Sequence, residues 1–255
     1  MNRFSSQNDE CVILVKALPH RSSNYYETVC CAGVGRDGKW RRQYPVPFRI
    51  LDNNQKFGRW DWVKYKFTTS KTDPRKESQK VIPESILPAG KMKSSERVKF
   101  INPLIRENLD EANKKGESLA LIRPDEILFS WKQKTDQELS DETQKHAELA
   151  NQLSLFDKNA KPLIPCPFLF TIKWHANNAV HNHVCDDWET STAFFRRKSV
   201  EGEAAALLSL KETYEEEYIK KGLCLAFSTH SRRNQQWLLV GLIRLDANHQ
   251  DDLFL

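Results

Sequence analysis

The sequence has no long hydrophobic run, and the first residues lack the features of an export signal. Its longest apolar stretches, such as residues 238–243, are far shorter than the roughly 20 residues that a membrane-spanning helix needs. The first ten residues are polar and acidic, whereas a secretory signal is basic and then apolar. We therefore expect a cytoplasmic protein with no membrane partner.

Glycine is scarce, and no two cysteines have the spacing of a metal-binding or redox pair. With nine glycines in 255 residues, the chain has no glycine-rich phosphate loop, no Gly-x-Ser-x-Gly elbow and no dinucleotide fingerprint. These absences argue against nucleotide-driven motors and serine hydrolases. The six cysteines include no Cys-x2-Cys pair, so we expect reduced thiols rather than a disulfide framework or a zinc ribbon.

The pattern that is present mixes short strand-like and helix-like segments, which is typical of an α+β protein. Strands are predicted at 11–18, 28–34, 40–44, 60–68, 118–122, 127–131, 168–174, 181–189, 223–227 and 237–245. Helices are predicted at 102–115, 135–151 and 203–221. We expect a β-rich N-terminal module at 1–100, barrel-like or strongly curved, then a helical linker region at 101–160 and an α+β module at 161–255.

Charge is distributed unevenly along the chain. Residues 1–100 contain 20 Lys and Arg against 10 Asp and Glu, whereas residues 101–255 contain 19 against 24. A basic half predicts an anionic partner, most economically nucleic acid, because phosphate contacts require only clustered Lys and Arg side chains. The alternative is a solvated surface that happens to be uneven.

The fourth predicted strand, at 60–68, predicts which basic side chains share one surface. Side chains alternate along a strand, so Val63 and Tyr65 would face the core while Trp62, Lys64 and Lys66 face outward. Nucleic acid needs cations for its phosphates and flat rings for exposed bases. The alternative is that the tryptophans are core residues covered by lysine stems. The predicted nucleic-acid-binding residues are Arg41, Arg42, Arg49, Arg59, Trp62, Lys64, Lys66, Arg75 and Lys76.

The pentapeptide Gln152, Leu153, Ser154, Leu155, Phe156 resembles the sliding-clamp-binding peptide of bacteria, whose pattern is Gln-Leu-Ser/Asp-Leu-Phe. The resemblance implies that Leu155 and Phe156 enter an apolar pocket on the clamp while Gln152 hydrogen-bonds at its rim. The predicted partner-binding residues are therefore Gln152, Leu153, Leu155 and Phe156. The alternative is an ordinary helix C-terminus that packs these apolar side chains into the core.

The segment 181–189 suggests a second kind of chemistry. In an extended chain, odd-numbered residues share a face, which would hold His181, His183, Asp187 and Glu189. His181 and His183 could bind a divalent metal ion, and Asp187 or Glu189 could activate water for phosphodiester hydrolysis. The alternative is a polar face exposed to solvent, since no His-Glu-x2-His or Cys-x2-Cys spacing is present.

The sequence also resembles a group of uncharacterised bacterial proteins over most of its length. The segments that carry the resemblance are ETVC at 27–30, AG at 32–33, WRR at 40–42, YPVPFR at 44–49, and His183 followed by DWE at 187–189. The resemblance implies one shared architecture and associates the chain with mobile elements or defence. It transfers no catalytic residue.

The leading prediction is a DNA-associated protein whose basic module holds nucleic acid and whose clamp-like peptide recruits it for DNA processing or defence. A metal-dependent nuclease is the first alternative, with the 181–189 face as its site. A non-catalytic protein whose basic face binds an acidic protein is the second. The sequence leaves open whether any reaction is catalysed, whether DNA or RNA is preferred, and which oligomer forms.

Overall fold

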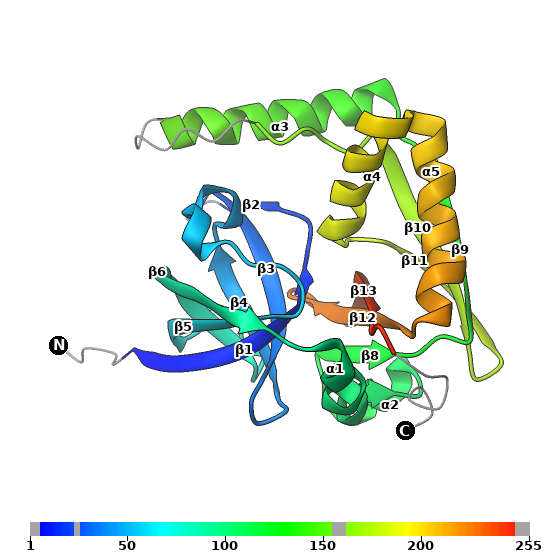
Figure 1. The fold of residues 1–255 in the computed structure, drawn as a ribbon. Helices are drawn as coiled ribbons and strands as arrows, with labels where there is room; N and C mark the ends of the chain where they lie inside the picture. The colour runs from blue at the N-terminus through cyan, green and yellow to red at the C-terminus, as the bar shows by residue number, and fades with distance from the viewer. Residues whose placement is uncertain (1–5, 23–25, 155–161, 248–255) are drawn as a thin grey trace. The chain divides into compact units, whose positions relative to one another are not determined.

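The structure, a computed structural model, describes residues 6–22, 26–154 and 162–247 and is an α+β fold with more strand than helix (Figure 1). Contacts divide the chain into two units. The first consists of Met1–Ile13, Leu18–Lys91 and Lys132–Leu169, and the second of Leu14–Ala17, Met92–Trp131 and Phe170–Leu255. Each unit therefore combines segments that are distant in the sequence, whereas the sequence predicted three consecutive segments.

The N-terminal part of the chain forms a closed five-stranded barrel, and this confirms the barrel-like module predicted from the sequence. The order around the barrel is β1-β5-β6-β4-β3, and β3 pairs again with β1 to close it. The β4–β6 pair is parallel, while β1–β5, β5–β6 and β3–β4 are antiparallel. The strands are β1 (Gln7–Lys16), β3 (Tyr26–Gly35), β4 (Trp40–Val46), β5 (Asp61–Thr69) and β6 (Ser78–Lys91), with the short β2 (His20–Ser22) added beside β3.

This strand order has a recognisable topology. Counted along the chain, the five barrel strands follow one another around the barrel as first, fourth, fifth, third and second, and the third and fifth are parallel. That is the topology of the oligonucleotide/oligosaccharide-binding (OB) barrel, a five-stranded Greek key. The topology describes the fold alone, because one fold supports many functions.

The barrel closes tightly where β1 meets β3. A Cβ atom on Gly33 would lie 2.5 Å from the Val12 carbonyl oxygen and 2.8 Å from Cys11 Sγ, so only glycine fits at this crossing. The inward side chains of β1 and β5 are buried, among them Ile13 and Val63. The predicted hairpin at 28–44 is confirmed by the pairing of β3 with β4 across a turn at Gly38, whose φ is +72°.

The second unit contains two further sheets. One has the order β13-β12-β8-β7 and the other β11-β10-β9. Helices α4 and α5 lie against the three-stranded sheet (Figure 1), where the Phe170 ring on β10 lies 5.9 Å from that of Phe194 on α4. The strands are β7 (Ile105–Arg106), β8 (Leu119–Ile122), β9 (Glu126–Gln133), β10 (Phe168–Ala176), β11 (Ala179–Val184), β12 (Leu223–His230) and β13 (Arg233–Arg244). The helices of the chain are α1 (Ser94–Ile101), α2 (Leu109–Lys114), α3 (Asp136–Ser154), α4 (Trp188–Glu201) and α5 (Glu203–Glu212).

Two predicted elements are wrong. The single helix predicted at 102–115 is instead a 3-10 turn, the short strand β7 and α2, because β7 pairs in parallel with β8 and this pairing overrides helix propensity. Asn108, rather than Asn102, caps α2 by accepting a hydrogen bond from Glu111 N at 2.9 Å. The strand predicted at 181–189 ends at Val184, and α4 begins at Trp188 with Asp187 as its N-cap.

Other helices agree with prediction. α3 covers the predicted 135–151 helix, and α5 continues through a π-helical turn (Thr213–Tyr218) toward Gly222, whose φ is +80°. Within the described ranges of the chain, no helix combines the length and apolar character needed to cross a membrane.

Candidate nucleic-acid interface

Side chains along β5 alternate between buried and exposed positions as predicted, with one exception. Tyr65 is buried in the barrel, and Lys64 and Lys66 are exposed on the outer surface. Trp62 points outward but is only 7 % exposed, and the Arg36 guanidinium lies 3.5 Å from its ring centre. The prediction of Trp62 as an exposed ring is therefore corrected, since a cation already covers its face.

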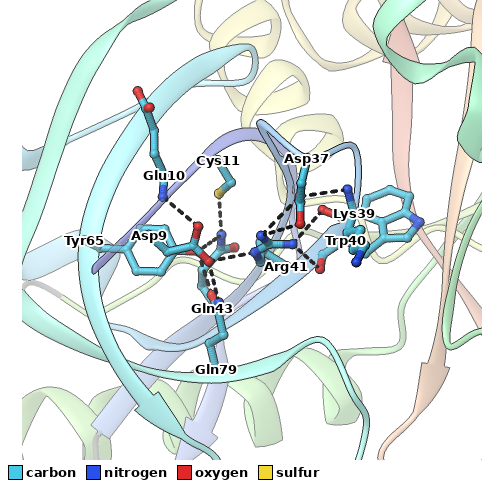
Figure 2. Close-up of polar contacts among 10 residues, drawn as sticks. All are labelled: Asp9, Glu10, Cys11, Asp37, Lys39, Trp40, Arg41, Gln43, Tyr65 and Gln79. Carbon is cyan, nitrogen blue, oxygen red and sulfur yellow. Dashed lines mark hydrogen bonds and ion pairs between the residues drawn. The ribbon is translucent and has the colours of Figure 1, made fainter. Parts of the chain in front are cut away.

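Arg41 is held inside the barrel by two carboxylates (Figure 2). Its Nε donates to Asp9 Oδ2 at 2.7 Å and a terminal nitrogen donates to Asp37 Oδ2 at 3.2 Å. Burial by itself would lower the pKa of the Arg41 guanidinium, but the hydrogen bonds to Asp9 and Asp37 raise that pKa above its ordinary value. Arg41 thus contributes to barrel structure through charges that it neutralises.

The polar side chains next to Arg41 are neutral and linked to one another (Figure 2). Tyr65 OH donates to Gln79 Oε1 at 2.6 Å, and Gln79 Nε2 donates to Asp9 Oδ2 at 2.7 Å. Burial raises the pKa of the Cys11 thiol to about 12, so it is protonated at neutral pH. A protonated, buried thiol is a poor nucleophile, and this network is best understood as structural.

Two more predicted arginines have acidic partners. Arg42 is 3 % exposed and donates to Glu77 Oε1 at 3.1 Å. Arg75 donates through Nε to Asp73 Oδ1 at 2.8 Å, and the hydrogen bonds with that carboxylate raise the arginine's pKa despite its partial burial. These pairs neutralise cations that the sequence assigned to phosphate binding.

The other predicted residues differ in exposure. Arg49, in a 3-10 turn (Phe48–Ile50), and Arg59 are half-buried, whereas Lys76 is exposed. Lys64, Lys66 and Lys76 form no ion pair with any residue that the structure describes. The cations that remain available to a ligand are therefore mainly lysines.

Strand register adds Lys80, which the sequence did not single out, and places it beside Tyr44. On the outer surface, Thr68 of β5 is opposite Lys80 of β6, and Lys80 is paired in turn with Tyr44 of β4. Lys80 is exposed, and the Tyr44 side chain is 39 % exposed. No local signal pairs residues 44 and 80, because only the parallel β4–β6 pairing brings them together. We call Lys64, Lys66, Lys80 and Tyr44 the basic track.

A groove of about 750 Å³ adjoins the basic track on the outer surface of β1, β5 and β6. Lys64 and Lys66 line it together with the apolar side chains of Ile82 and Leu87. Its remaining lining residues are Asn8, Asp9, Glu10, Tyr65, Glu84 and Ser85. The volume is in the range of ligand-binding sites.

The clamp-like peptide begins at the end of α3. Gln152, Leu153 and Ser154 are the last residues of that helix, and Leu155 and Phe156 lie outside the described residues. The helix therefore extends into the first three positions of the motif.

The two histidines predicted to bind metal lie beside one tryptophan, and the two predicted catalytic acids have structural partners instead. The His181 ring stacks on Trp174 at a centroid distance of 4.2 Å, and His183 Nδ1 accepts from Trp174 Nε1 at 3.1 Å. Asp187 is 1 % exposed and caps α4, and Glu189 pairs with Lys16 Nζ at 3.2 Å. Among the described residues, no three His, Cys, Asp or Glu side chains gather closely enough to hold a metal ion.

Comparison with known families gives two matches. A domain of unknown function (DUF8758) matches residues 7–106, which contain the barrel, and a domain of unknown function (DUF8757) matches residues 103–255. No curated protein matches the chain. These two matches confirm the resemblance to an uncharacterised family. The second match covers more than half of the sequence. The chain therefore belongs to the family of the domain of unknown function DUF8757.

Proposed function

We propose that the barrel binds nucleic acid, with DNA as the expected ligand, through the basic track on the outer surface of β4, β5 and β6. The observation that carries this proposal is the register that sets Lys66, Lys80 and Tyr44 on one exposed surface. Ammonium groups on a sheet surface neutralise successive phosphates without needing any base sequence.

The distribution of ion pairs supports an excess of positive charge at this surface. Five of the ten acids in residues 1–100 pair with arginines, namely Asp9, Glu10, Asp37, Asp73 and Glu77. Lys64 and Lys66 are exposed and form no ion pair with any described residue, and Glu10, the acid opposite Lys64 on β1, pairs with Arg36. The OB topology of the barrel adds an analogy, since barrels of this topology bind oligonucleotides or oligosaccharides.

Salt-dependent binding tests the proposal. A triple variant, Lys64→Ala/Lys66→Ala/Lys80→Ala, should bind a labelled oligonucleotide more weakly, and its slope of log K against log salt should be shallower by about 2. A control triple variant, Lys114→Ala/Lys145→Ala/Lys173→Ala, removes the same charge from exposed positions elsewhere. Equal slopes for the two triple variants would contradict the proposal.

Recruitment by a sliding clamp is a second part of the proposal, supported by the five-residue match at 152–156. Leu155→Ala/Phe156→Ala should abolish co-purification with the clamp while the circular dichroism spectrum stays unchanged. Retained co-purification would end this part of the proposal without affecting the barrel. The nuclease alternative stays a prediction that the arrangement of its four residues does not favour.

A further inference from the structure

We infer that the ligand of the barrel is a single strand whose unstacked bases enter the groove beside the basic track. This inference rests on the proposed function and specifies its ligand class. The groove and the track share Lys64 and Lys66, so a backbone held by those lysines would place its bases against the groove wall.

The groove is a fixed feature of the barrel because a bulge in β6 forms one of its walls. Lys66 is paired with Ile82 and Lys64 with Leu87, so the four residues 83–86 bulge out opposite a single β5 residue. Ser85 Oγ accepts from Lys66 N at 2.7 Å and donates to Ile82 O at 2.6 Å.

A second side chain holds the bulge from its other side. Gln55 Nε2 donates to the carbonyl oxygens of Pro83, Glu84 and Ile86 at 3.2–3.4 Å. The groove is therefore preorganised before any ligand arrives, which reduces the entropic cost of binding.

The lining of the groove suits bases better than phosphates. Leu87 is 56 % exposed, and together with Ile82 it offers an apolar surface to the flat face of a base. Glu84 and Asn8 offer a carboxylate and an amide, which hydrogen-bond to the amino groups of bases and, in the case of Glu84, repel phosphate. Lys64 and Lys66 lie on the central strand of the groove, between the β1 wall and the apolar β6 wall, where they can hold a backbone.

The combination of an apolar wall for bases with lysines for phosphates favours a single strand over a duplex. In a duplex the phosphates are outermost, and the base faces are stacked and inaccessible to a shallow apolar groove. Tyr44 provides a further aromatic face beside Lys80, at the other end of the basic track. Aromatic side chains that alternate with cations are the arrangement by which proteins hold unstacked bases.

Four probes at one salt concentration test the inference: a labelled 15-nucleotide DNA strand, the RNA strand of the same sequence, the DNA annealed to its complement, and heparin, which has no bases. We expect at least one single strand to bind tenfold or more tightly than the duplex. Tyr44→Ala and Leu87→Ala should each weaken single-strand binding about fivefold to a hundredfold and leave heparin binding within twofold.

Matched variants complete the test. Tyr44→Phe keeps the ring and should retain single-strand binding, and Leu208→Ala removes an equally exposed leucine on α5 and should change nothing. Equal affinity for strand and duplex, or equal losses for single strand and heparin in the Tyr44→Ala and Leu87→Ala variants, would overturn the inference while the proposed function stands. If none of the four probes binds, the proposed function itself is refuted.

Discussion

Arg41 Nε lies 2.7 Å from Asp9 Oδ2, in an ion pair between β4 and β1, two strands that are not hydrogen-bonded neighbours in the barrel. Both side chains are largely buried, so each charge is compensated by the other within the fold. The pair thus ties the barrel together across β3, and the charge that made Arg41 a predicted phosphate ligand is already balanced within the fold.

Removal of one member of this pair should destabilise the barrel. Asp9→Asn leaves the Arg41 guanidinium without its main partner, and we expect the free energy of unfolding in urea to fall by about 2 kcal/mol. The exposed partner gives the control, since Asp37→Asn should cost less than about 1 kcal/mol. In the double variant Asp9→Asn/Arg41→Met, the loss should be smaller than the sum of the two single losses. An additive result would show that the two charges are not coupled.

Gly33 is expected to be intolerant of any side chain. Gly33→Ala places a Cβ 2.5 Å from the Val12 carbonyl oxygen, and relief requires β1 and β3 to move apart, at a cost of about 1–3 kcal/mol. Gly58→Ala is the matched control, because its Cβ would meet only Asp61 Oδ2 at 3.6 Å. Thermal unfolding of the two variants measures the difference, and a similar melting temperature for both would contradict the close approach.

Asp187 is expected to be needed for stability. Its two carboxylate oxygens accept from Glu189 N at 3.1 Å and from Leu242 N at 3.0 Å, so Asp187→Ala leaves a buried N–H without an acceptor. We expect a loss of about 2–4 kcal/mol in the free energy of unfolding. Glu189→Gln, which weakens a partly exposed ion pair with Lys16, should cost less than about 1 kcal/mol. A nuclease role predicts the opposite pattern, in which Asp187→Asn abolishes DNA cleavage and leaves stability unchanged.

The stability of the second unit is expected to fall in mild acid through His183. Burial, together with the neighbouring His181, lowers the pKa of His183 below its ordinary value of 6.5. The unfolded chain therefore binds a proton more readily than the folded chain, and stability declines as the pH falls below about 6.5. Protonation of Nδ1 would also break the hydrogen bond from Trp174.

Urea unfolding between pH 5 and pH 7 measures this effect. His183→Gln keeps an acceptor near Trp174 but does not titrate, so its free energy of unfolding should depend less on pH than that of the wild type. An identical pH dependence in the two proteins would assign the acid sensitivity to other groups.

Local pattern predicted much of the fold because its signals lie within a few residues of one another. The alternation of Val63, Lys64 and Tyr65 along β5 was correct, since side chains on a strand alternate with a period of two. The turn chemistry around Gly38 identified the β3–β4 hairpin for the same reason. The helix at 102–115 was wrong because β7 is too short to leave a pattern and forms only by pairing with β8.

The candidate site depended far more on distant partners. The sequence identified Lys64 and Lys66, which the groove and the basic track retain, and it missed Lys80 and its pairing with Tyr44. It also counted Arg41 as available, because an acid 32 residues away cannot be assigned to it without the barrel.

The amino-acid order by itself determined that this chain has a basic, β-rich first part and an α+β character, because charge and periodicity are local properties of the sequence. Only the tertiary structure decided which cations lie exposed on the barrel surface. The barrel pairs Arg41 with Asp9 of β1 and Arg42 with Glu77 of the turn before β6, and it leaves lysines in the groove. These pairings depend on strand register, which is a property of the whole sheet.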